Sequence, residues 1–194
     1  MEQISISVDW VIIGIVGAVA FILLLTFWVV YNSLVARRLK VKESFSGIYI
    51  QLKRRADLIP NIVAAVKGYV QHERETLERL TRLRTSFFGV DSSNRSAVME
   101  QGNLLTQALK TVFAVAENYP DLKASQNFLK LQESLEETED QVAAARRIYN
   151  ANVNDYNSMV QQFPSNVIAK LFAFKEEPFF KTDETLEVVP VISF

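Results

Sequence analysis

The 194-residue sequence contains no cysteine, one histidine, five prolines and six glycines. Without cysteine the chain cannot form disulfides, thiolate nucleophiles, or zinc and iron–sulfur sites with cysteine ligands. A single histidine leaves few metal sites open. Because glycine and proline mark turns, their scarcity predicts a few long elements instead of many short ones.

The net charge of −1 conceals an uneven distribution. Residues 37–84 carry 12 basic and five acidic side chains, whereas residues 85–194 carry nine basic and 15 acidic ones. Two interpretations stay open. Oppositely charged parts of one helical domain attract each other, or the basic part lies close to lipid.

Residues 10–30 form a long apolar run, WVIIGIVGAVAFILLLTFWVV, without a charged side chain. As a helix this run is about 30 Å long, which matches the hydrocarbon core of a bilayer. Trp10 and Trp28 lie near its ends, where amphipathic rings favour the headgroup layer. A cleaved signal peptide fits less well, because a basic n-region is missing and the run is too long. We therefore predict an uncleaved transmembrane helix.

Basic residues follow the apolar run, and none precedes it. By the positive-inside bias, residues 1–9 should lie outside the cytoplasmic membrane and the C-terminal bulk inside. Gly14 and Ala18 form one small-xxx-small pair, a weak indication of a homo-oligomer. The basic residues that set this topology are Arg37, Arg38, Lys40 and Lys42.

Apolar residues recur at helical spacing beyond the span, which predicts four helices. The first continues the transmembrane helix and should end near Asp57, because Pro60 lacks an amide hydrogen. Pro60 should then lie in the first turn of the second helix. Pro120 should close the third helix, and Asp121 should lie in the first turn of the fourth.

The fourth predicted helix has apolar residues at a regular interval of seven positions, which indicates that it packs lengthwise against other helices. It exceeds the cytoplasmic part of the first helix by roughly 20 Å, so it should bend near its asparagine-rich run or lean across the headgroups. Gly47 and Gly68, placed evenly about the expected first turn, predict a close helix crossing. The seven-residue seam is Phe128, Leu135, Val142, Tyr149, Tyr156 and Phe163.

The predicted fold is all-α, an N-terminal transmembrane helix that continues into an antiparallel up-down four-helix bundle. The bundle should cover residues 31–163 and lie in the cytoplasm. Residues 164–194 form an aromatic-rich tail, and residues 163–180 alone contain five Phe. A short helix after Pro164 could fold back onto the bundle, or the tail could contact lipid.

Several motifs together resemble the LemA family of bacterial membrane-anchored helical proteins, over roughly residues 31–174. The resemblance implies an antiparallel four-helix cytoplasmic bundle on one N-terminal anchor, with a largely undefined biochemical role. Some relatives take part in magnetosome membrane biogenesis. Phe45-Ser46 departs from the family's common Trp-Ser pair. The motifs are QLKRRADLIPN at 51–61, VKGY at 66–69, ENYPDLKAS at 117–125, RRIYN at 146–150 and FPSN at 163–166.

Residue patterns for catalysis are weak. His72-Glu73 lacks the second histidine that a zinc protease needs four residues on, because position 76 is Thr. We expect His72 to be an ordinary surface residue. Carboxylates in residues 136–140 lack the Glu-x-x-His pairs of di-iron sites. We therefore expect no enzyme activity, no cofactor, no metal and no nucleic-acid partner.

In an up-down bundle, the turn between the first two helices and the turn between the last two lie at the same end. Charged residues of both turns should therefore meet there. They would form either a charge-complementary lock between the hairpins or a surface that docks a partner. The residues of this predicted tip are Lys53, Arg54, Arg55, Asp57, Pro60 and Asn61 from the first turn, and Glu117, Asp121 and Lys123 from the second.

The sequence thus predicts a membrane-anchored, non-enzymatic scaffold or adaptor at the cytoplasmic face of a bacterial inner membrane. Its partners would be the lipid bilayer and unidentified membrane or cytoplasmic proteins. The alternative is a membrane-shaping or envelope-biogenesis protein that self-associates and contacts lipid.

Overall fold

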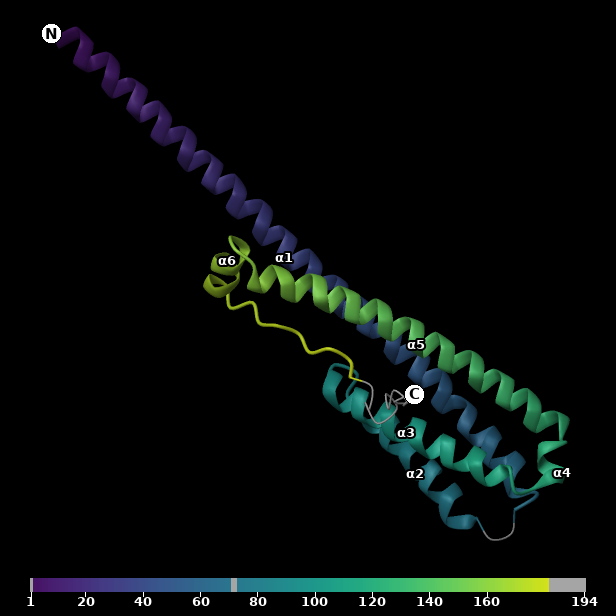
Figure 1. Cartoon of the computed structure of the whole chain (residues 1–194). Coiled ribbons are helices and arrows are strands. Elements are labelled where there is room, and N and C mark those ends of the chain that lie inside the picture. Colours follow the sequence, from purple (N-terminus) through teal and green to yellow (C-terminus); the bar gives the residue numbers. More distant parts are fainter. Residues whose placement is uncertain (1, 71–72, 182–194) are drawn as a thin grey trace, which may run out of the picture. The chain divides into compact units, whose positions relative to one another are not determined.

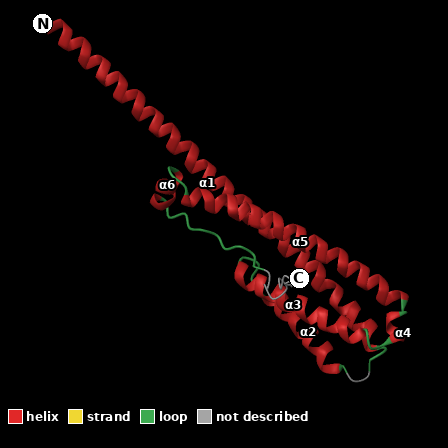
Figure 2. Cartoon of the chain, viewed as in Figure 1, coloured by secondary structure: helices red, strands yellow, loops and turns green. Residues whose placement is uncertain are grey.

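The computed structural model describes residues 2–70 and 73–181, with side chains from Trp10 onward. These residues form helices and loops and contain no strand (Figure 2), so the predicted all-α class is confirmed. The chain divides into two compact units. The first combines residues up to 42 with residues 152–178, and the second combines residues 43–151 with those from 179 onward. His72 and the tail beyond residue 181 lie outside the described residues.

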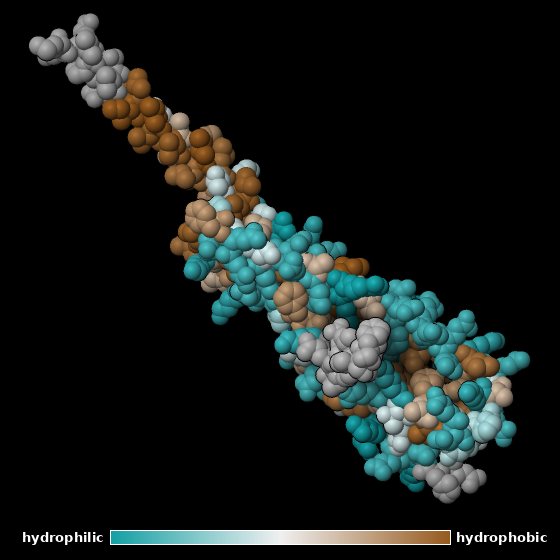
Figure 3. All heavy atoms as spheres, viewed as in Figure 1, coloured by the Kyte–Doolittle hydropathy of each residue, from teal (hydrophilic) through white to brown (hydrophobic). Residues whose placement is uncertain are grey.

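The first helix, α1 (Glu2–Lys67), has 66 residues. It contains one segment apolar and long enough to cross a membrane, with a mean hydropathy of 2.7 and none of that segment buried. The brown surface near the N-terminus in Figure 3 belongs to this apolar segment, residues 10–30. An apolar surface this long is exposed in a protein only where something apolar covers it. Lipid is such a cover, and α1 therefore contains a candidate transmembrane helix.

The predicted end of the first helix near Asp57 is wrong, because α1 continues through Pro60 to Lys67. Proline in a helix leaves the carbonyl four residues earlier without its amide donor. Here that carbonyl belongs to Ala56, and Arg84 Nε donates to its oxygen at 3.1 Å. Arg84 lies on α2 (Arg74–Gly89). A side chain from another helix thus replaces the missing backbone donor, and α1 ends at Lys67 instead.

The second unit also contains α3 (Arg95–Ala116), α4 (Pro120–Lys123) and most of α5 (Gln126–Gln161). Helices α2 and α3 lie side by side (Figure 1). The Asn94 side chain caps α3 by accepting a hydrogen bond from the Ala97 amide at 3.2 Å. Pro120 begins α4, where its missing amide hydrogen is harmless. The predicted fourth helix is therefore divided into α4 and α5.

Buried apolar side chains at helical spacing form the core of the second unit. The predicted seam is confirmed over this part of α5, and Phe45 packs edge-on against Tyr149 with 5.7 Å between ring centroids. The core residues include Ile48, Leu52, Ile59 and Ile62 of α1, Leu77, Leu80 and Phe87 of α2, Leu105, Leu109 and Val112 of α3, and Phe128, Leu135 and Val142 of α5.

Two expectations that rested on a turn near Asp57 also fall away. Because α1 reaches Lys67, its residues beyond the span match the 36 residues of α5, and no surplus length remains. A Cβ atom at Gly47 would meet nothing within 4 Å, and one at Gly68 only the Ala65 carbonyl oxygen at 3.7 Å. The close approach occurs at Gly102 instead, where a Cβ would lie 2.9 Å from Leu52 Cδ1.

The first unit joins residues 2–42 of α1 to the end of α5 and to α6 (Ser165–Leu171). The predicted short helix after Pro164 is confirmed. Tyr156 continues the buried seam of α5, but Phe163 is 83% exposed. The seam stops there because α5 ends at Gln161 and the chain turns before α6.

Candidate functional site

The predicted tip residues divide into one buried side chain and a set of exposed ones. Arg55 is completely buried, whereas the others are exposed. Arg54 and Asp57 line a groove of about 350 Å³ with residues of α5, including Glu137. Among the described residues, no ion pair joins residues 53–61 to residues 117–123. The geometric reason for that pairing was the turn near Asp57, which the structure places elsewhere.

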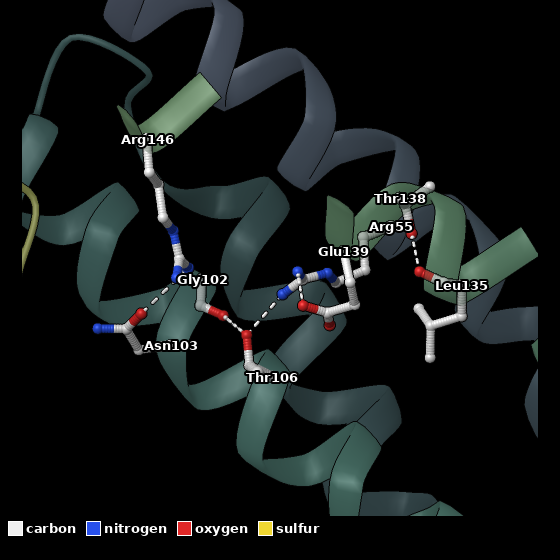
Figure 4. A network of polar contacts seen from close by, with 8 residues as sticks. All are labelled: Arg55, Gly102, Asn103, Thr106, Leu135, Thr138, Glu139 and Arg146. Atoms are coloured by element: carbon white, nitrogen blue, oxygen red, sulfur yellow. Dashed lines mark hydrogen bonds and ion pairs between the residues drawn. The ribbon is translucent and has the colours of Figure 1, made fainter. Parts of the chain in front are cut away.

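Arg55 links three helices through a polar network inside the second unit (Figure 4). Its Nη2 lies 2.6 Å from Glu139 Oε2 of α5, and its Nη1 donates to Thr106 Oγ1 of α3 at 2.5 Å. Thr106 in turn donates to the Gly102 carbonyl at 2.9 Å. One cation on α1 thereby satisfies groups on α3 and α5, so α1, α3 and α5 are tied together at this level.

The close packing at Gly102 makes this network geometrically possible. Gly102 lies against the side chain of Leu52 on α1, so a side chain at this position would have to displace Leu52 or move α3 away from α1. Thr106 follows one helical turn later and meets Arg55, which lies three residues beyond Leu52 on α1. The absent side chain therefore brings the hydroxyl into reach of the guanidinium.

Electrostatics favour a structural role for Arg55. Burial lowers the pKa of its guanidinium, Glu139 opposes this shift, and nearby Arg146 adds to it. Nε of Arg55 is buried without a hydrogen-bond partner among the described residues. Removing Glu139 would leave a buried cation uncompensated, which is strongly destabilising. The arrangement thus resembles the predicted lock in kind, but its acid is Glu139 instead of Glu117 or Asp121.

Arg146 extends the basic character of this region. Its Nη2 donates to Asn103 Oδ1 at 3.4 Å (Figure 4). Its guanidinium lies 4.3 Å from the centroid of the Phe180 ring. Burial lowers the pKa of Arg146, and Glu139 opposes the shift. Glu139 therefore compensates part of the charge of both Arg55 and Arg146, which explains the presence of a carboxylate next to the core at this level.

The topology cations lie just beyond the apolar segment and belong to the first unit, whose part of α1 ends at Lys42. Arg37 forms an ion pair with Asp155 at 3.3 Å, and Arg38 lies 3.9 Å from a carboxylate oxygen of Glu177. The Arg38 guanidinium also lies 6.0 Å from the centroid of the Phe174 ring. Lys40 and Lys42 are exposed, as are Trp10 and Trp28 within the apolar segment.

Two asparagines of α5 form hydrogen bonds to the backbone of the segment that follows α6. In the first unit, Asn157 donates to the Glu177 carbonyl and accepts from the Glu177 amide, both at 2.9 Å. In the second unit, Asn150 donates to the Phe180 carbonyl at 3.1 Å and accepts from its amide at 2.8 Å. Each side-chain amide satisfies one backbone donor and one acceptor, as a neighbouring strand would.

Tyr156 completes these contacts in the first unit by donating to the Lys175 carbonyl at 2.9 Å. Burial raises the pKa of its hydroxyl, Arg38 opposes the shift and Glu177 adds to it. The neutral hydroxyl is the form that can donate this bond, so geometry and the direction of the pKa shift agree.

Sequence reasoning missed Gly102, Thr106, Glu139 and the two asparagines. One signal was available for Glu139, which lies four residues after Leu135 and therefore beside the buried seam of α5. Arg55 was predicted to lie in the charged tip, opposite Glu117 and Asp121. The pairing of Arg55 with Glu139 required the registry of α1 against α5, which spacing within each helix does not contain.

The described residues contain no cluster of three His, Asp or Glu side chains that could hold a metal ion. A groove of about 850 Å³ runs between the end of α1 and α2. It combines an apolar floor with charged rims and brings together no nucleophile with a base. Its lining residues are Val63, Lys67, Val70, Arg74, Leu77, Glu78, Thr81 and Arg82.

These features define a class: a helical protein with one candidate transmembrane helix and a packed helical region whose polar network is structural. The model of the LemA family matches residues 44–194, and the chain therefore belongs to the LemA family. The predicted resemblance is confirmed.

Curated relatives agree with this assignment. Protein LemA of Metamycoplasma hominis is 29% identical over 164 residues, which cover 81% of this chain and 74% of the relative. Magnetosome protein MamQ 2 of Paramagnetospirillum magneticum is 24% identical over 196 residues, covering 88% of this chain and 71% of the relative. Magnetosome protein MamQ of Magnetospirillum gryphiswaldense is 22% identical, covering 87% and 70%. The names of these relatives do not denote enzymes, and two of the names place the relative in the magnetosome.

Proposed function

We propose that this protein is a membrane-anchored, non-enzymatic scaffold or adaptor at the cytoplasmic face of a bacterial inner membrane. The observation that carries the proposal is α1 itself. One helix bears an exposed apolar segment long enough to span a bilayer and then supplies a buried face to the core of the second unit. A single element thus couples membrane attachment to a helical domain with a charged surface.

We infer further that the second unit is an antiparallel up-down four-helix bundle made by residues 43–67 of α1 with α2, α3 and α5. The buried seams of these helices support it. So does the Arg55 network, which needs α1, α3 and α5 in contact. A bundle offers its outer helix faces to partners without needing a cavity.

The docking surface we propose consists of the exposed tip residues and excludes Arg55, which is committed to the core. Lys53, Arg54 and Asp57 of α1 present mixed charge. Asp121 and Lys123 present a second mixed-charge pair on α4, within the motif ENYPDLKAS. Mixed exposed charge favours a partner with a complementary pattern, which sets specificity and the rate of association more than raw affinity.

In-cell photo-crosslinking tests the adaptor proposal. Benzoylphenylalanine at Arg54 or Asp121 should give adducts with a different protein, and reversing the charge of Asp57 should abolish those from Arg54. The same probe at Lys110, an exposed residue of α3, is the matched control. Adducts that survive charge reversal, or that arise equally from Lys110, would contradict a docking surface at these residues.

Orientation is tested separately, since the chain has no cysteine of its own. A membrane-impermeant maleimide should leave Lys130→Cys unlabelled in intact spheroplasts and label it after permeabilisation. The basis is the one-sided cluster of Arg37, Arg38, Lys40 and Lys42. Labelling in intact spheroplasts would place the second unit outside and remove the cytoplasmic adaptor.

A membrane-shaping protein is the second candidate. It is favoured by the exposed apolar residues of α6 and by relatives whose names place them in the magnetosome. The full chain, reconstituted at increasing density in liposomes, should then tubulate or constrict them in electron micrographs. Unchanged liposome shape at a protein density that saturates the membrane would leave the adaptor as the sole proposal.

A further inference from the structure

Helix α6 presents an apolar face outward. Ile168 and Ala169 are buried, so the inner side of the helix is accounted for by the first unit. On the outer side, Val167 and Leu171 are 59% and 72% exposed, and because they lie four residues apart on α6 they share one face. Phe163, in the turn before α6, is 83% exposed. A surface helix in water carries polar residues on its outer face, so apolar residues on that face indicate apolar surroundings.

The position of α6 beside the apolar segment of α1 indicates what covers its outer face. Phe172, directly after the helix, lies with its ring centroid 5.7 Å from that of Phe27 and 4.9 Å from that of Tyr31. Phe174 lies 5.9 Å from Tyr31. Phe27 lies at the end of the apolar segment of α1 and Tyr31 directly follows that segment, and Trp28 between them is 64% exposed. Aromatic rings at the end of a span sit at headgroup height.

Within the first unit, α6 therefore lies beside α1 at the level where a membrane would end (Figure 1). Apolar surface continues from the apolar segment of α1 onto this region of the first unit in Figure 3. The exposed face of α6 is thus continuous with the surface that lipid would already cover, which points to the same occupant for both.

Backbone hydrogen bonds at both ends of α6 suit an apolar environment, where each polar group needs a partner inside the protein. At its end, the Phe174 amide donates to the Ala169 carbonyl at 2.9 Å and the Ala173 amide to the Lys170 carbonyl at 3.2 Å. Ala173 adopts a φ of 53° to close this turn. At its start, the Asn166 amide donates to the Gln162 carbonyl at 2.8 Å.

Polar side chains around α6 also suit a membrane interface. The Ser165 hydroxyl turns inward and lies within hydrogen-bonding distance of the Met159 carbonyl at 2.6 Å and the Gln162 carbonyl at 2.9 Å. Lys170 is exposed next to Leu171 and can reach lipid phosphates while its stem follows the apolar face.

We propose that α6, with the turn before it, is a second membrane contact, which inserts the side chains of Phe163, Val167 and Leu171 among the headgroups and the upper acyl chains of the lipid bilayer. Such helices bury their apolar face about 5–10 Å into this boundary. The proposal rests on the membrane anchoring in the proposed function, and it adds that the first unit touches the bilayer with two elements.

Nitroxide labels on single cysteines test this contact, because the chain has no other cysteine to label. The full chain is reconstituted in vesicles of three parts POPC to one part POPG, with labels on Val167→Cys, Leu171→Cys, Leu24→Cys or Asn154→Cys. Power-saturation EPR then compares accessibility to oxygen, which concentrates in lipid, with accessibility to a nickel chelate, which stays in water. Leu24 reports the span, and Asn154 is an exposed polar position of the same unit.

We expect oxygen accessibility to exceed nickel accessibility at positions 167 and 171, as at position 24, and the reverse at position 154. Nickel accessibility at 167 and 171 equal to that at 154, with position 24 in lipid, would overturn the α6 contact alone. Position 24 in water would overturn the anchoring instead.

Two further outcomes would also overturn the proposal. Low accessibility to both reagents at 167 and 171 means that protein covers α6. If spin–spin broadening accompanies it and disappears on dilution with unlabelled chain, the cover is a second copy, and without broadening it is another part of the same chain. Helical content by circular dichroism, unchanged from the unlabelled chain, verifies that each labelled variant is folded.

Discussion

Replacing Arg84 should reveal how α1 tolerates a proline in its interior. Pro60 removes the amide that would bond the Ala56 carbonyl, and Arg84 Nε supplies the donor at 3.1 Å. Ala56 is completely buried, so no water can take over. Arg84→Met keeps an apolar stem of similar length and leaves the carbonyl unsatisfied. A buried unsatisfied polar group costs about 1–3 kcal/mol of folding free energy.

The proline makes this loss conditional. In a Pro60→Ala background, residue 60 regains its amide and can bond the Ala56 carbonyl within the helix. Arg84→Met should then cost less, and a double-mutant cycle should give a coupling energy of about 1 kcal/mol or more. Pro60→Ala alone should stabilise the chain, by less than the roughly 3 kcal/mol of a proline in an unassisted helix interior.

Thermal unfolding of the full chain in detergent micelles, followed by circular dichroism at 222 nm, measures these differences. For a chain of this size, each 1 kcal/mol corresponds to about 2–4 °C in Tm. Arg82→Met is the matched control, because the Arg82 side chain is exposed and pairs only weakly with Glu78 at 3.8 Å, and it should leave Tm unchanged. Equal effects of Arg84→Met with Pro60 and with Ala at position 60 would refute the donor replacement.

Three further predictions concern packing, titration and the segment after α6. Gly102→Val should lower the free energy of unfolding by about 1–3 kcal/mol through overpacking against a buried leucine, whereas Gly47→Ala, which meets nothing, should raise it by up to about 1 kcal/mol in the same melts. The raised pKa of Tyr156 predicts that the contribution of this residue to the free energy of unfolding is constant below pH 10.0, the ordinary pKa of the group, and falls above it, because the unfolded chain ionises first. Tyr156→Phe should flatten this fall, and an unchanged slope would contradict the prediction. Asn157→Ala removes two hydrogen bonds to the segment after α6 and should speed tryptic cleavage after Lys175, with an unaltered rate counting against that role.

Patterns within one helix were readable from the sequence because they depend on local geometry. The apolar segment, the short helix after Pro164 and most of the α5 seam all follow from spacing, turn residues and length. Each of these features is decided by residues within a few turns of one another. Hydrophobic periodicity therefore suffices to find them.

The tip shows where such reasoning stops. Pro60 correctly signals a lost backbone hydrogen bond, yet whether the helix ends there depends on a donor 24 positions later in the chain, on Arg84. Once that donor is present, α1 continues to Lys67, and the expected meeting of Arg55 with Glu117 and Asp121 loses its basis. A single tertiary hydrogen bond thus altered several dependent predictions.

What the sequence alone determined about this protein is its class: all-α, with one apolar segment suited to a bilayer and membership in the LemA family. Composition and periodicity are sufficient for these, because burial of apolar surface dominates the energy and leaves a regular trace along the chain. Only the tertiary structure decided that Arg55 pairs with Glu139, that Gly102 is the close contact and that α6 turns an apolar face outward beside Phe27 and Tyr31. These depend on the registry between helices, which arises from the packing of side chains distant in sequence and has no periodic signature of its own.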